Sequence, residues 1–125
     1  MNKDHDEYLC KKYPKLFVNR HASTQETAMC WGFECGDGWF NLIDTLCYSI
    51  QRYIDVTGAP QVVVDQVKEK FGTLRFYVTG GDYNTSGMIT LAENLSGKIC
   101  EECGSHGTVG ANGWIRTLCD KHRNE

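Results

Sequence analysis

Four residues near the C-terminus have the types and the spacing of a metal site. They are Cys100, Cys103, Cys119 and His122, which form a C-x2-C pair and a C-x2-H pair separated by fifteen residues. Two ligands spaced by two residues sit on one tight turn, and a second such pair brought back by a loop completes a tetrahedron. Because all four positions are filled by protein ligands, the pattern predicts a structural Zn²⁺ rather than a catalytic one.

Other cysteines and histidines leave two alternatives open. In the first, His106 replaces His122 as the fourth ligand if the turn folds differently. In the second, another metal site forms from residues whose spacing along the chain is less regular. The candidates for that second site are Cys10, His21, Cys30 and Cys35. Cys47 lies on the apolar face of an expected helix and is interpreted as a packing residue.

Two further groups of residues have side chains that could do chemistry. Asp37 stands between two glycines, which suits an accessible general base, but it also stands where the N-cap of a helix is expected, and we favour the cap. Glu69, Lys70 and Arg75 lie in an expected β-hairpin and form an acid–lysine set of the kind used in phosphodiester cleavage. Such sets are more often the solvated face of a strand.

The elements that must position these residues can be predicted from hydrophobic periodicity. Residues 39–54 repeat apolar side chains at spacings of three and four, which predicts a helix. Residues 61–69 and 74–78 predict a hairpin, with Asp65, Val67 and Glu69 on one face of the first strand. A second helix is expected over residues 86–95, with Met88, Leu91, Ala92 and Leu95 facing inward. The sequence thus predicts an α+β fold in which residues 1–97 form a helix–hairpin–helix core and residues 98–125 a zinc-binding module of treble-clef or zinc-ribbon type.

Composition and charge argue against several functional classes. The formal net charge is −3 and the pI is about 5.8, with no dominant cluster of Lys and Arg, so nucleic-acid binding through the zinc module ranks last. No apolar run approaches the length of about 20 residues that crosses a bilayer. The acidic N-terminus lacks the features of a signal peptide. We therefore expect a cytoplasmic protein without a membrane segment.

Aromatic residues are more numerous than a small core accommodates. Those between residues 31 and 77 include Trp31, Phe33, Trp39, Phe40, Phe71, Phe76 and Tyr77. Trp and Tyr are enriched where proteins bind one another, so part of the set is expected to form a recognition surface. The alternative is that all of them fill the core. The candidate binding residues are Trp31, Asp37, Trp39, Glu69, Lys70 and Arg75.

Two stretches of the chain carry a resemblance to known proteins. They are GFECGDGWFNLI at residues 32–43 and QVKEKFGTLRFY at residues 66–77, followed by Ala92, Glu93 and the cysteine-rich tail. Together they resemble a family of small, largely uncharacterised proteins from bacteriophages and prophages. The resemblance implies an α+β core with a C-terminal zinc module, in a protein that works in the cytoplasm of the host cell.

That context ranks three functional hypotheses. The first is a non-enzymatic accessory protein that binds and modulates a host protein, including components of bacterial immunity. The second is a nucleotide-binding protein or phosphodiester-cleaving enzyme that uses Asp37, Glu69, Lys70 and Arg75. The third is a zinc-dependent nucleic-acid binder.

Overall fold

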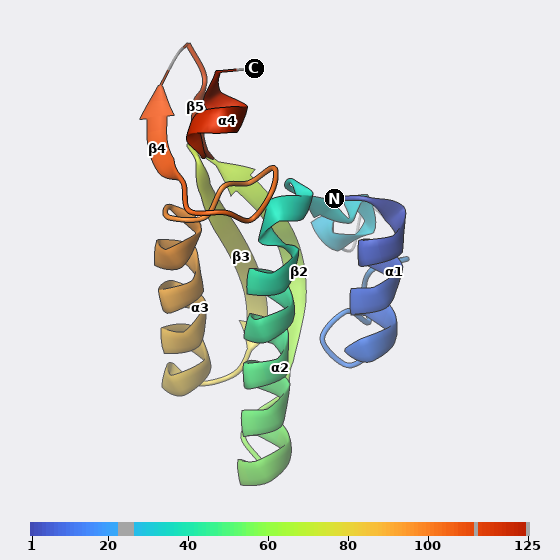
Figure 1. Ribbon diagram of the computed structural model, residues 1–125. Coiled ribbons are helices and arrows are strands. Elements are labelled where there is room, and N and C mark those ends of the chain that lie inside the picture. Colours follow the sequence, from blue (N-terminus) through green and yellow to red (C-terminus); the bar gives the residue numbers. More distant parts are fainter. Residues whose placement is uncertain (23–26, 112, 125) are drawn as a thin grey trace.

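The computed structural model describes residues 1–22, 27–111 and 113–124, and it has the α+β architecture predicted from the sequence. A three-stranded sheet of order β1-β2-β3 carries helices α2 and α3 side by side on one face, and a second sheet pairs β4 with β5 (Figure 1). The helices are α1 (Lys3–Lys12), η1 (Ala28–Trp31), η2 (Asp37–Trp39), α2 (Phe40–Thr57), α3 (Tyr83–Ser96) and α4 (Asp120–Arg123). The strands are β1 (Phe33–Glu34), β2 (Val62–Lys70), β3 (Thr73–Gly80), β4 (Thr108–Ala111) and β5 (Ile115–Leu118).

Helix α2 follows the predicted apolar stripe. Ile43, Leu46, Cys47 and Ile50 are buried in the hydrophobic core, which confirms the packing role of Cys47. The helix ends at Gly58, whose left-handed backbone conformation stops the α-helical hydrogen bonding. The prediction that Asp37 caps this helix was wrong. A short 3-10 helix, η2, intervenes, so α2 begins three residues later without any side-chain cap.

Strands β2 and β3 form the predicted hairpin. They are joined by Phe71 and Gly72, which both have positive φ values of 54° and 85°, the arrangement of a two-residue type I′ turn. A β-bulge interrupts the pairing between Val64 and Gln66. The bulge shifts the alternation, so that Val64 and Val67 are both buried. The expectation that Asp65 shares the face of Val67 was therefore wrong.

Helix α3 begins earlier than predicted because a capping box defines its start. The Asp82 carboxylate accepts a hydrogen bond from Thr85 N, and the Thr85 hydroxyl accepts one from Asp82 N. Two of its residues that were predicted to face inward are exposed instead: Leu91 at 62% and Leu95 at 40%. Ala92 is buried as predicted, together with Ile89, so the buried side of the helix is rotated away from Leu91 and Leu95.

Side chains of α3 also close the outer edge of β3. The Ser96 hydroxyl accepts a hydrogen bond from Leu74 N at 2.8 Å, and the Glu93 carboxylate accepts one from Phe76 N at 2.9 Å. These strand amides point away from β2, and without the side chains they would have no protein partner. The edge strand is therefore satisfied by a helix rather than by another strand.

The C-terminal segment from residue 98 follows directly on α3. It contains the turn with the first cysteine pair, then the β4–β5 hairpin, then the short helix α4. Thr117 ties it to the main hairpin, because its hydroxyl donates to Gly72 O at 2.6 Å. Within the described ranges, no helix has the length and apolar character needed to span a membrane.

Candidate metal centre

The four predicted ligands come from two local structures, a tight turn and the short helix α4. Cys100 and Cys103 lie on a tight turn in which Gly104 N donates to Cys100 O at 2.9 Å. Gly104 has a φ of 82°, which closes such a turn and is readily adopted by glycine. Cys119 is the N-cap of α4, and His122 lies within that helix. The turn and the helix thus present their ligands from opposite sides of one point.

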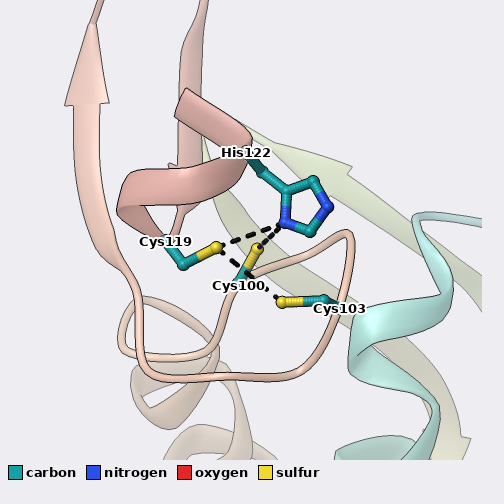
Figure 2. Close-up of side chains that lie close together, drawn as sticks. All are labelled: Cys100, Cys103, Cys119 and His122. Carbon is teal, nitrogen blue, oxygen red and sulfur yellow. Dashed lines mark hydrogen bonds between the residues drawn. The ribbon is translucent and has the colours of Figure 1, made fainter. Parts of the chain in front are cut away.

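The ligand atoms converge as a tetrahedral site requires. All four lie within 4.8 Å of one another, and Figure 2 shows the three sulfur atoms and the imidazole pointing toward a common centre. Cys103 Sγ lies 3.8 Å from Cys119 Sγ, and His122 Nδ1 lies 3.6 Å from Cys100 Sγ and 3.2 Å from Cys119 Sγ. Tetrahedral zinc with bonds of about 2.3 Å to sulfur and about 2.0 Å to nitrogen places two sulfur atoms about 3.8 Å apart and a sulfur and a nitrogen atom about 3.5 Å apart. The donor set therefore fits a metal ion of this size.

The electrostatics of the turn favour a metal-binding thiolate. Interactions with the Ser105 side chain and backbone lower the pKa of the Cys103 thiol to about 6. The thiolate is the form that binds metals. Cys100 is buried, whereas Cys103 is exposed and the other two ligands are half-buried. Four protein ligands leave no open coordination position, so the arrangement suits a structural role.

The first cysteine pair is docked on the Gly36-Asp37-Gly38-Trp39 turn. Gly38 N donates to Glu101 O at 2.7 Å, and the Trp39 indole donates to Ile99 O at 2.9 Å. A Cβ atom on Gly38 would lie 2.1 Å from Cys100 O, and one on Gly36 would lie 2.3 Å from Glu101 O. The two glycines are therefore needed for close backbone contact with the metal-binding turn, a role that the sequence did not reveal.

Glu101 is the residue of this site that sequence reasoning missed. Its side chain is 7% exposed, and its Oε2 atom accepts a hydrogen bond from Gly36 N at 2.8 Å. Burial raises the pKa of the carboxyl group, while the Arg116 guanidinium lies 3.7 Å from Oε1. A glutamate between two cysteines gives no signal of burial, because the contact that buries it comes from a distant part of the chain.

Asp37 and Trp39 both make contacts that hold elements of the fold together. The Asp37 carboxylate accepts hydrogen bonds from Asn2 N at 2.7 Å and from His5 Nδ1 at 3.0 Å, which keeps the pKa of Asp37 below its ordinary value. The His5 ring also stacks on Phe40, with ring centroids 4.0 Å apart. Asp37 thus joins the start of α1 to the start of α2. Trp39 is completely buried, which corrects its placement among the surface binding residues.

The remaining candidate residues of the hairpin serve separate interactions. The Glu69 carboxylate accepts a hydrogen bond from Gly72 N at 2.9 Å, and Lys70 Nζ lies 5.7 Å from the centre of the Phe71 ring. Arg75 stands opposite Lys68 in the strand register. Over the described residues, no ion pair links any two of Asp37, Glu69, Lys70 and Arg75.

The alternative metal ligands do not assemble. Among the residues that the structure describes, the cluster with metal-binding geometry consists of the four predicted ligands. It includes neither His106 nor the second set, which comprises Cys10, His21, Cys30 and Cys35. His122 therefore occupies the fourth position, as first predicted.

A surface hollow lies where the tips of the two hairpins meet, and we call it the hairpin-tip notch. Its volume is about 370 Å³, and it is lined by Glu69, Lys70, Phe71, Gly113, Trp114 and Ile115. The Phe71 and Trp114 side chains are 64% and 72% exposed. Trp31, the exposed tryptophan of the candidate set, lies at the end of η1, at 66% exposure, and Trp114 was not among the candidates.

Comparison of the chain with protein-family models, with curated proteins and with solved structures found no match. The resemblance to phage proteins stays a prediction.

Proposed function

We propose that this chain is a zinc-stabilised binding protein that acts by contact with a protein partner at the hairpin-tip notch, and that it is not an enzyme. The observation that carries the proposal is Phe71, a large apolar residue held in a strained and exposed conformation at the tip of the main hairpin. The metal centre contributes stability, and the notch contributes recognition.

The chemistry of the donor set supports Zn²⁺ as the metal. Three thiolates and one imidazole in a closed tetrahedral arrangement form a Cys3His site, which is common among structural zinc sites. The order of a cysteine turn, a β-hairpin and a short helix that carries the last ligand supports a treble-clef module. Binding of the ion would hold together the segment from residue 98 onward, whose described residues include few buried apolar side chains.

Phe71 is costly in the free protein. A positive φ in a residue other than glycine costs on the order of 1 kcal/mol or more, and asparagine or glycine is normally found at this position of a type I′ turn. The side chain is 64% exposed, so little burial offsets the strain. Trp114, which lines the same notch, is more exposed still. A partner that covers both rings would explain why apolar residues stand here.

The class of partner follows from charge and composition. Aromatic side chains around a hollow are typical of anchor points in protein interfaces. The protein is acidic overall, with a net charge of −3, which disfavours a phosphate backbone as the ligand. The predicted phage context favours a host protein, such as a component of bacterial immunity, as the partner. The enzyme alternative draws less support, because Asp37, Glu69 and Arg75 have separate surroundings.

The test is affinity capture with matched variants at the notch. We expect tagged wild-type protein to retain a stoichiometric partner from host lysate, and Phe71→Asn and Trp114→Ala to lose that same partner. Asparagine tolerates positive φ, so Phe71→Asn keeps the turn and leaves the thermal midpoint unchanged or higher. Tyr48→Ser, which alters a 52% exposed ring on α2, is the control that retains the partner. Equal capture by wild type and both notch variants would contradict the proposal.

A further inference from the structure

We infer that one exposed face of helix α3 is the contact surface for a second copy of this chain, through an antiparallel pairing of the two α3 helices about a two-fold axis. This face, the α3 stripe, consists of Tyr83, Gly87, Leu91 and Leu95. It lies apart from both the metal centre and the hairpin-tip notch, so the inference is independent of the proposed function.

The α3 stripe is apolar and exposed along the whole helix. Its members recur every four residues, which places them on one side of an α-helix. Tyr83, Leu91 and Leu95 are 96%, 62% and 40% exposed. The one charged residue of α3, Glu93, turns to the sheet, where its carboxylate accepts the hydrogen bond from Phe76 N. The stripe therefore has the spacing of a buried helix face but no covering element among the described residues.

Gly87 is the residue that the fold of a single chain does not explain. It lies in the interior of α3, where glycine costs roughly 0.5–1 kcal/mol relative to alanine. Its φ is not positive, and a Cβ atom placed there would meet no atom within 4 Å. Alanine would therefore fit in the isolated chain. A glycine is required at such a position when a second helix approaches closely.

The pattern of sizes identifies the second helix as another α3. A two-fold axis that crosses the stripe midway between Gly87 and Leu91 sets Leu91 of each copy against Gly87 of the other. The same axis sets Leu95 of each copy against Tyr83 of the other. A large side chain thus faces the smallest one at the centre, as a self-complementary interface requires.

The α3 stripe is uncharged and lies beside an apolar hollow. Identical chains of net charge −3 repel one another, and the α3 stripe contains no charge to add to that repulsion at close range. Beside the stripe, α2 and α3 enclose a hollow of about 140 Å³, to which α2 contributes Leu42, Thr45 and Ser49. Leu91 and Leu95 of the α3 stripe form one wall of this hollow, so the apolar surface extends from the stripe toward α2.

Sedimentation velocity of the full chain tests this surface. The wild type is expected to shift with concentration from the monomer mass of 14.1 kDa toward twice that mass. Leu91→Asp is expected to raise the dissociation constant at least about tenfold, because it buries a charge in each half of the interface. Gly87→Met is expected to do the same while raising the thermal midpoint of the dilute monomer, since methionine favours the helix.

Val56→Asp is the matched control, because it places the same charge on a 68% exposed apolar residue at the end of α2. It is expected to dimerise like the wild type. The inference would be overturned if the wild type stayed at monomer mass up to about 1 mM, because a dissociation constant above that concentration corresponds to a binding free energy weaker than about 4 kcal/mol. The stripe would then be the contact surface for an unrelated partner. A dimer that persists in both Leu91→Asp and Gly87→Met would overturn it too, because the interface would then lie elsewhere.

Discussion

Replacing Gly38 by alanine is expected to undock the metal-binding turn from the core. The added Cβ atom would lie 2.1 Å from Cys100 O and 2.6 Å from Glu101 C, both backbone atoms. Ordinary contacts begin near 3.4 Å, so the two segments must separate by about 1 Å. Such a separation is incompatible with the present hydrogen bond from Gly38 N to Glu101 O.

The size of the effect follows from the bonds that hold the turn. The docking uses the Gly38 amide, the Gly36 amide and the Trp39 indole as donors. A typical hydrogen bond contributes about 1 kcal/mol net, so losing all three costs roughly 3 kcal/mol. For a chain of this size, that corresponds to a drop of roughly 10 °C in the thermal midpoint. Over-packing alone costs about 1–3 kcal/mol, which agrees with this range.

Calorimetry of the zinc-loaded protein, together with chelator-driven metal release, measures the change. Gly38→Ala is expected to unfold at lower temperature and to lose metal at lower chelator concentration. Gly87→Ala is the matched control, because it is the same substitution at a glycine with open space around it; measured on the dilute monomer, it should be neutral or stabilising by up to about 1 kcal/mol. If Gly38→Ala matched the wild type in both assays, the docking described here would not be a tight contact.

Two further predictions concern the metal and the Asp37 contact. Cys103→Ser is expected to abolish stoichiometric zinc, measured by elemental analysis, and to collapse the amide NMR signals of residues 98–124, because metal binding and folding are coupled in such segments; a metal-free wild type with an unchanged spectrum would refute the site. The pKa of Asp37 is held below its ordinary value of 3.8, first by the Asn2 amide and then by His5. The charged carboxylate therefore stabilises the fold above that ordinary value, and the contribution is lost as the pH falls through the lower folded pKa. Asp37→Asn should accordingly be less stable than the wild type near neutral pH, with the gap closing below about pH 4; a gap that stays constant down to about pH 2 would contradict the assignment.

Periodicity and spacing were sufficient for the local parts of this fold. The apolar repeat of α2 holds because residues such as Ile43, Leu46 and Ile50 are all buried in one core. The turn at Phe71 and Gly72 was predictable because a short segment that contains a glycine separates two strand-like runs. The cluster of Cys100, Cys103, Cys119 and His122 was predictable because two-residue spacing is itself a geometric constraint, independent of the rest of the chain.

Contacts between distant segments were not predictable from one sequence. Gly36 and Gly38 indicated an accessible loop, yet both are covered by Glu101, which lies more than sixty residues away. A hydrophobic repeat shows which face of a helix is apolar, but it does not show whether a neighbouring element covers that face. For that reason, Leu91 was predicted to be buried and is exposed. The bulge at Asp65 likewise depends on its pairing with β3.

The closed edge of β3 limits how this protein can associate with others. An extended peptide adds to a sheet by bonding to unpaired strand amides, and here the amides of Leu74 and Phe76 are already bonded to Ser96 and Glu93. An incoming strand would have to displace two side chains of α3 before forming its first bonds. Association at this side of the molecule is therefore limited to contacts between side chains. Such a contact is complete once one complementary surface has bound, whereas strand addition can repeat and produce an open-ended fibre.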